Sequence, residues 1–232
     1  CSPTGAGRFS CPRPPATEYA MLRRIALSLM VWCSAWPLQA AAQDTALDRF
    51  LAGLGSWRAE FTQTTTDARG RSRGREQGRL IVQRPGRFRW ETGPAAAAEP
   101  AQVMVADGRN LWFFDRDVEQ VTVKPSSTAM TVTPATLLAG TVPLRSAFSV
   151  SELPRRDGLD WVRVVPLRTD AEFRETRLGF RGLELRRMEL DDKLGQKVLI
   201  VFERIERNPT LADTAFRFEP PPGADVIGTP VR

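Results

Sequence analysis

The chain of 232 residues contains no histidine, only three cysteines and a single tyrosine. The cysteines (Cys1, Cys11 and Cys33) and Tyr19 all lie within the first 42 residues. The rest of the chain therefore lacks the most common general base, the thiol nucleophile and the best ligands for transition metals. This composition predicts neither a catalytic residue nor a metal ligand, and it predicts that the protein is not an enzyme.

Sequence motifs of nucleotide sites and serine hydrolases are also missing: there is no phosphate-binding glycine loop, no Rossmann fingerprint and no G-x-S-x-G. Asp115, Asp117 and Glu119 have the spacing that begins a calcium loop. Such a loop would also need glycine and glutamate where the sequence has Gln120 and Ser126. We interpret the triplet as a solvated hairpin turn. A hydrolase that uses a Ser/Lys pair or two carboxylates is the alternative from another class.

The first 42 residues are predicted to be absent from the working protein. Residues 1–20 resemble an upstream extension that is not native, and Met21 then begins a segment with two arginines and an apolar stretch. Small residues follow at Ala40 and Ala42, which is the order of a secretory signal peptide, and the apolar run is too short to span a bilayer comfortably. We predict a signal peptide over residues 21–42 and a single domain over residues 43–232.

Cys33 does not have the sequence context of a lipid attachment site. A lipobox places small residues before the modified cysteine, whereas Val31 and Trp32 precede Cys33. We therefore expect export to release the protein rather than to tether it. Cleavage near Ala42 would take away four of the 33 basic residues and one of the 27 acidic residues, which leaves a net charge of +3. This mild charge and the predicted export argue against nucleic acid as a partner.

Hydrophobic periodicity predicts two short helices and about eleven strands in the remaining chain. The first helix carries apolar residues at i, i+3, i+4 and i+7 spacing: Leu47, Phe50, Leu51 and Leu54. The second begins with Thr133 and Pro134 as N-cap and first helical residue and ends at Gly140. Pro-Gly and Asp-Gly turns separate the strands. The pattern predicts one strongly curved antiparallel sheet or an all-β barrel.

Large aromatic residues are concentrated in the N-terminal half of the predicted strands: Trp57, Phe61, Phe88, Trp90, Trp112, Phe114 and Phe148. They can form an ordinary core, or they can line a ligand cavity, because a curved sheet does not fill its own concave face. Periodicity alone does not separate these two interpretations.

Arginines form the strongest charge cluster of the sequence: Arg69, Arg71, Arg73, Arg75 and Arg79. One interpretation is a patch that contacts an anionic membrane surface or an acidic partner. We favour the interpretation of this segment as a flexible, solvated hairpin loop.

Four segments occur in this order along the chain: GRLIVQRPGRFRWE (78–91), VADGRNLWFFDRDVEQVTV (105–123), TPATLLAG (133–140) and FRFEPPPGADV (216–226). Together they resemble the family of outer-membrane lipoprotein carrier proteins, LolA. The first helix and SWRAEFTQ (56–63) fit the start of that family. Over residues 144–211 the similarity is one of strand pattern only.

The resemblance implies a mainly β fold, an unclosed antiparallel β-barrel whose short α-helices form a lid over a hydrophobic cavity. It also implies a soluble, monomeric chaperone in the periplasm of a Gram-negative bacterium, without a cofactor. Such a chaperone accepts acylated lipoproteins from an inner-membrane lipoprotein-releasing ABC transporter and delivers them to an outer-membrane receptor. A periplasmic carrier or sensor of another lipid on the same half-barrel is the alternative.

The resemblance further assigns roles to individual residues. It implies a cavity lined by Trp57, Phe61, Leu80, Val82, Phe88, Trp90, Leu111 and Phe113. It implies a lid formed by Leu47, Phe50, Leu51, Leu54, Leu137 and Leu138. Arg84 is expected to point inward and bond to the lid, with a surface arginine before a Pro-Gly turn as the alternative. Whether Leu111 and Phe113 face the cavity, or Trp112 and Phe114 do, is left open by the sequence.

Overall fold

The computed structural model describes residues 44–95, 97–126, 134–141, 143–169, 171 and 173–231. The predicted upstream extension, the predicted signal peptide and the predicted N-cap Thr133 lie outside these residues. No helix in the described part of the chain is long and apolar enough to span a bilayer.

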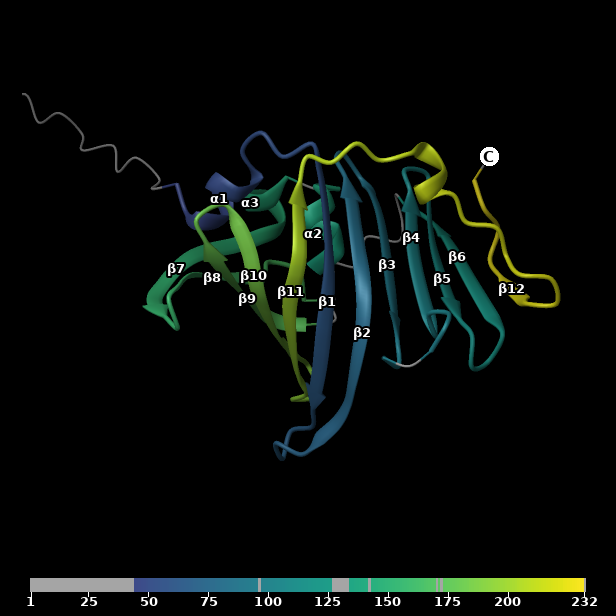
Figure 1. Ribbon diagram of the computed structural model, residues 1–232, viewed down its shortest axis with the longest axis horizontal. Coiled ribbons are helices and arrows are strands. Elements are labelled where there is room, and N and C mark those ends of the chain that lie inside the picture. The colour runs from purple at the N-terminus through teal and green to yellow at the C-terminus, as the bar shows by residue number, and fades with distance from the viewer. Residues whose placement is uncertain are drawn as a thin grey trace, which may run out of the picture. The chain divides into compact units, whose positions relative to one another are not determined.

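Twelve strands form a single sheet (Figure 1). They are β1 (Ser56–Thr66), β2 (Ser72–Gln83), β3 (Arg87–Gly93), β4 (Gln102–Asp107), β5 (Asn110–Asp115), β6 (Gln120–Pro125), β7 (Phe148–Arg156), β8 (Leu159–Pro166), β9 (Phe173–Arg181), β10 (Glu184–Asp192), β11 (Lys197–Arg207) and β12 (Asp225–Ile227). Their order is β12-β6-β5-β4-β3-β2-β1-β11-β10-β9-β8-β7, so β12 and β7 are the two edges and the sheet is unclosed. Neighbours are antiparallel except β12 and β6, which run parallel. The strand missed by periodicity is β12, whose three residues are all exposed.

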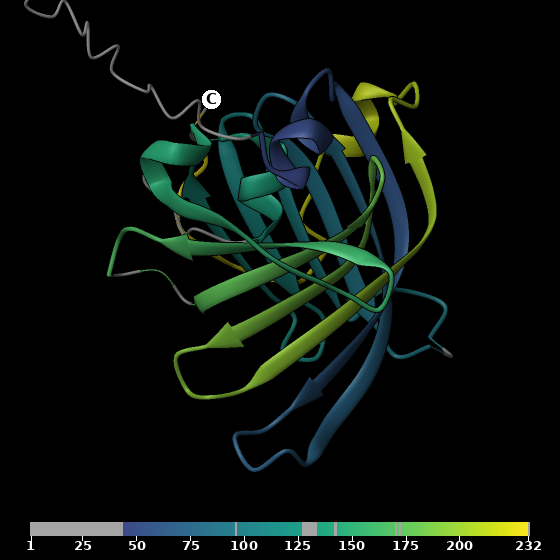
Figure 2. The ribbon, with the colours of Figure 1, turned by 90° about the vertical axis from the view of Figure 1, so that its left-hand side faces the viewer.

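The sheet curves strongly, and several register shifts accompany the curvature. Irregularities occur in β1 between Arg58 and Glu60, and in β10 between Leu185 and Arg187. Such bulges increase the local twist of a strand. Figure 2 shows the strands of the sheet wrapped around the short helices, which lie on its concave side.

The helices are α1 (Ala46–Leu51), α2 (Pro134–Ala139), α3 (Leu144–Ala147) and the 3₁₀ turn η1 (Asp213–Phe216). A capping box fixes the start of α1: Thr45 N donates to Asp48 Oδ2 over 2.9 Å, and Asp48 N donates to Thr45 Oγ1 over 3.3 Å. After α1 the chain turns at Gly53, whose φ of 66° is favourable for glycine. The predicted first helix and its glycine end are therefore confirmed, whereas α3 was not predicted.

A second apolar cluster lies on the convex face, and it explains why β5 is apolar on both sides. It consists of Val103, Val105, Trp112, Phe114, Val121 and Val123. The C-terminal segment covers it, with the Phe218 ring 5.6 Å from that of Trp112 and 6.2 Å from that of Phe114. Leu111 and Phe113 consequently lie on the concave face.

The favoured interpretation of the arginine-rich segment as a solvated hairpin loop holds for Arg69 and Arg71 but is wrong from Ser72 onward. Strand β2 begins at Ser72, so that Arg73, Arg75 and Arg79 belong to it, and Arg75 pairs with Thr64 of β1. The turn is confined to residues 67–71, where the Asp67 carboxylate accepts hydrogen bonds from the backbone N–H groups of residues 69 and 71. Hydrogen bonds between the backbones of β1 and β2 hold this segment in a strand. Its sequence does not alternate between apolar and polar residues, so the strand could not be recognised from periodicity.

Candidate functional site

All eight residues predicted for the cavity lie on the concave face of the sheet. The register places them on this face because directly paired residues of antiparallel strands point to the same side. Trp57 pairs with Val82, which pairs with Phe88, and Phe61 pairs with Gly78. Leu80 pairs with Trp90, and Leu111 and Phe113 pair with Ala106 and Met104 of the neighbouring strand.

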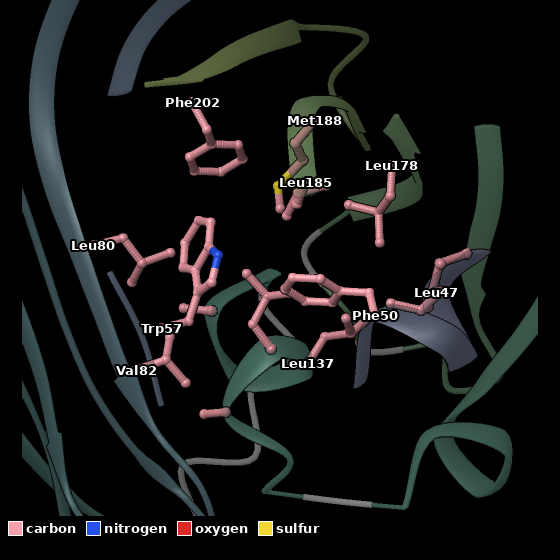
Figure 3. Packing of buried hydrophobic residues seen from close by; sticks show 14 of the residues in the cluster. Leu47, Phe50, Trp57, Leu80, Val82, Leu137, Leu178, Leu185, Met188 and Phe202 are labelled. Atoms are coloured by element: carbon pink, nitrogen blue, oxygen red, sulfur yellow. The ribbon is translucent and has the colours of Figure 1, made fainter. Parts of the chain in front are cut away.

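Helix α1 places an aromatic ring at the centre of this concave face (Figure 3). The Phe50 ring lies edge-on to Trp57 of β1, at 6.3 Å and 86° between the ring planes. It also lies 5.5 Å from the Phe180 ring of β9. Phe50 is 0% exposed, so a single side chain of the lid connects strands from the two halves of the sheet.

The other predicted lid residues join the same apolar cluster. Leu47, Leu54, Leu137 and Leu138 are buried within it, and Leu51 is partly buried against it. Each buried leucine or phenylalanine contributes about 1.5–3 kcal/mol through removal of apolar surface from water. The helices therefore occupy the concave face with apolar contacts comparable to those of a protein core.

A cavity of about 250 Å³ remains on the concave face beside the helices. It is lined by Gln63, Trp90, Thr92, Gln102, Met104, Phe113, Ala135, Leu190, Val198 and Ile200. Among the predicted cavity residues, Trp90 and Phe113 line this space, and the other six pack against the helices or neighbouring strands. The volume is below the range of roughly 300–1,000 Å³ of typical ligand pockets, so a large apolar ligand requires the lid side chains to move.

The C-terminal half of the sheet contributes lining residues that were not predicted. Leu190 of β10 pairs with Val198 of β11, and Met188 pairs with Ile200. Phe202 faces Phe61, with 6.2 Å between the ring centres. The alternation of Val198, Ile200 and Phe202 is the signal in the sequence that could have identified them.

Arg84 lies at the end of β2, directly against the end of helix α2. Gly140 has a φ of 66°, and a Cβ atom added there would lie 2.6 Å from Arg84 Nη2. Nη1 is buried without a hydrogen-bond partner among the described residues. Burial lowers the pKa of the Arg84 guanidinium, because desolvation disfavours the charged form. The arginine is thus in contact with the predicted lid, while the predicted hydrogen bonds to the lid are not formed with any residue that the structure describes.

Polar contacts hold both ends of α1 in place. At its start, the Asp48 carboxylate accepts a hydrogen bond of 2.6 Å from Arg145 of α3. Burial raises the pKa of Asp48, but hydrogen bonds from Thr45 and the Arg145 charge outweigh this and leave that pKa below its usual value. At its end, Arg207 donates to the carbonyl oxygens of Phe50 and Ala52, each over 2.7 Å. The role of Arg207 was not predicted.

Comparison with known proteins gives one consistent family. The family described as "Outer membrane lipoprotein carrier protein LolA" matches residues 52–219. An outer-membrane lipoprotein carrier protein of Methylobacillus flagellatus is 38% identical over 208 residues, which cover 89% of this chain and 100% of the relative. Another, from Dechloromonas aromatica, is 39% identical over 183 residues, or 78% of this chain and 86% of the relative. A solved LolA superfamily protein of Nitrosomonas europaea has a TM-score of 0.46 at 13% identity, over 75% of this chain and 96% of that one.

Replacement of Val198 by tryptophan is expected to fill part of the cavity and to weaken binding of an apolar fluorescent probe such as N-phenyl-1-naphthylamine. The indole ring would occupy space that is otherwise open to the probe, so the dissociation constant should rise about tenfold in a fluorescence titration. Leu199→Trp is the matched control, because Leu199 is the next residue of β11 and is exposed on the convex face. Equal probe affinities of the two variants would contradict this location of the cavity.

Proposed function

Because the chain belongs to the family of outer-membrane lipoprotein carrier proteins, we propose that it shields the acyl chains of lipoproteins on the concave face of its sheet. One observation supports this role above the others: an extensive apolar concave face is occupied by side chains of short helices rather than by a second sheet. Helix α1 has six residues, and a helix of this length is stable only through its tertiary contacts. It can therefore be displaced without disrupting the strand pairing.

The free energy of acyl chain hydration explains why such a carrier is needed. Burial of an acyl chain is worth about 0.8 kcal/mol per CH₂ group. A sixteen-carbon chain therefore gains on the order of 12 kcal/mol by leaving water. A protein with several acyl chains does not cross an aqueous compartment at a useful concentration unless an apolar surface covers them.

Exchange between lid and cargo keeps the affinity of the carrier moderate. Cargo acyl chains would contact the same aromatic surface that Phe50 and Leu47 contact in the closed protein. Binding therefore replaces one set of apolar contacts by another. The net binding free energy is then smaller than the free energy gained by removing the acyl chain from water. A moderate affinity is required if the cargo is to leave again at its destination.

The route proposed for the cargo follows from the family and from the predicted export. The processed protein would work in the periplasm as a monomer. It would receive lipoproteins from an inner-membrane lipoprotein-releasing ABC transporter and pass them to an outer-membrane receptor.

Arg84 would favour release of the cargo. Its guanidinium lies beside the carboxyl-terminal end of α2, where the last carbonyl groups of a helix favour a cation. Displacement of α2 by acyl chains would remove these carbonyl groups from the guanidinium. The closed, empty state is thereby favoured relative to the loaded state.

The carrier function predicts that the protein, purified from the periplasm, releases radiolabelled lipoproteins from spheroplasts into the supernatant. Val198→Glu should abolish release, because a carboxylate in the apolar cavity disfavours acyl chains, whereas Leu199→Glu on the convex face should release normally. Mass spectrometry of the copurifying material should identify acylated protein. Failure of the wild-type protein to release lipoproteins, or copurification of free lipid alone, would contradict the proposal.

Arg84→Leu is expected to load lipoproteins normally but to transfer them to outer-membrane receptor at a rate at least tenfold lower. The reason is that leucine removes the interaction between the guanidinium and the carboxyl-terminal end of α2, which favours the closed state. Arg84→Lys keeps the charge and is expected to retain most of the transfer activity. A two-step assay that measures loading and transfer separately checks this prediction. Normal transfer by Arg84→Leu would contradict it.

A further inference from the structure

Two turns meet at one end of the sheet and form a continuous surface. The turn between β1 and β2 comprises residues 67–71, and the turn between β10 and β11 comprises residues 193–196. They are in contact, because a Cβ atom added at Gly195 would lie 3.1 Å from Cβ of Ala68. The hairpin of β1 and β2 projects at the lower edge of Figure 1.

This surface is basic, and we call it the basic tip. It consists of six exposed cationic residues: Arg69, Arg71, Arg73, Arg75, Lys193 and Lys197. Arg71 and Arg73 pair with Asp67, and Lys193 Nζ donates to the Thr169 carbonyl. The side chains of Arg69 and Arg75 have no ion pair or hydrogen bond within the part of the chain that the structure describes.

The acidic residues near the basic tip are engaged within the protein. Asp67 accepts backbone hydrogen bonds from residues 69 and 71. Asp192 caps the other turn by accepting from the backbone N–H groups of residues 194 and 196 over 2.8 and 2.7 Å. Glu76 accepts from Gln63, and Asp191 pairs with Arg177. The cationic side chains are therefore the groups that extend into solvent.

An exposed apolar side chain lies within the basic tip. Leu194 occupies the turn between β10 and β11, next to Lys193, and is 79% exposed, the highest value among the large hydrophobic residues of the described ranges. Full exposure of a leucine has no structural benefit, because it contributes nothing to the core. An exposed leucine on a basic surface is typical of a segment that inserts shallowly into an anionic lipid surface.

The cavity lies at the same end of the sheet as the basic tip. Gln63 is three residues from the end of β1, Leu190 is two residues from the end of β10, and Val198 is the second residue of β11. The contact of Arg84 with Gly140, by contrast, is at the opposite end of β2. A membrane that bound the basic tip would thus be close to the empty part of the concave face.

We propose that the basic tip docks the protein on the surface of an anionic phospholipid membrane, with Leu194 inserted between the headgroups. Each lysine or arginine near such a surface strengthens binding, and a single apolar residue adds to it. A projecting tip with extended side chains fits a fluid lipid surface, whereas a stable protein partner requires about 800 Å² of closely packed complementary surface on each side. This interaction is additional to the carrier function and does not depend on it.

Cosedimentation of the purified, processed protein with lipid vesicles tests the proposal. The wild-type protein should bind vesicles of phosphatidylglycerol and phosphatidylcholine at low salt and should not bind vesicles of phosphatidylcholine alone. Arg69→Gln/Arg75→Gln should lower the partition coefficient by about tenfold or more. The matched control, Arg109→Gln/Arg181→Gln, removes the same charge from exposed arginines at the opposite ends of the strands and should bind like wild type.

Leu194→Gln should weaken vesicle binding severalfold, whereas Leu183→Gln should not. Leu183 is the matched control because it is 50% exposed in the turn at the other end of β10. Equal vesicle binding by tip and control variants, or tip-dependent binding to polyglutamate but not to vesicles, would overturn the proposal. Lipoprotein release from spheroplasts is measured in parallel: a wild-type protein that releases lipoproteins but does not bind anionic vesicles overturns this inference and leaves the carrier function standing.

Discussion

The contact between Phe50 and the concave face of the sheet is the interaction on which the closed structure depends. A strongly curved sheet exposes more apolar surface on its concave side than its own strands can cover, and here a short helix covers it. The Phe50 ring touches Trp57 on one side and Phe180 on the other, so that the two halves of the sheet are held around it. The same surface is the one that an acyl chain would need, so that in the proposed carrier the lid and the cargo compete for it.

This competition determines how the lid is attached. Apolar contacts hold α1 on the sheet, and its ends are fixed by a few polar groups: Arg145 at the start through Asp48, and Arg207 at the end through backbone carbonyls. These exposed or half-exposed contacts are individually weak, which is compatible with repeated opening. In the proposed carrier cycle, the contact of Arg84 with the end of α2 would favour the closed state over the loaded one.

Much of the N-terminal part of the site could be predicted, because its sequence motifs and its alternation of apolar and polar residues indicate the same strand faces. Where the prediction from sequence failed, contacts between residues far apart in sequence determine the structure. The choice between Leu111 and Trp112 required knowledge that Phe218 returns to cover the convex face, a contact between residues far apart in sequence. The lining supplied by β9–β11 lacks a recognisable motif, although Val198 and Ile200 alternate correctly. The arginine-rich part of β2 looked like a loop, because strand pairing with β1 leaves no apolar signature in its sequence.

Hydrogen exchange of the empty and the lipoprotein-loaded protein, followed by mass spectrometry, tests whether the lid and the cargo occupy the same surface. We expect loading to reduce the protection of amides in α1 strongly, because Phe50 must leave the concave face. Amides in the paired central strands β1 and β2 should stay protected in both states, which provides an internal control. Unchanged protection of α1 in the fully loaded protein would contradict the claim that the lid and the cargo occupy the same surface.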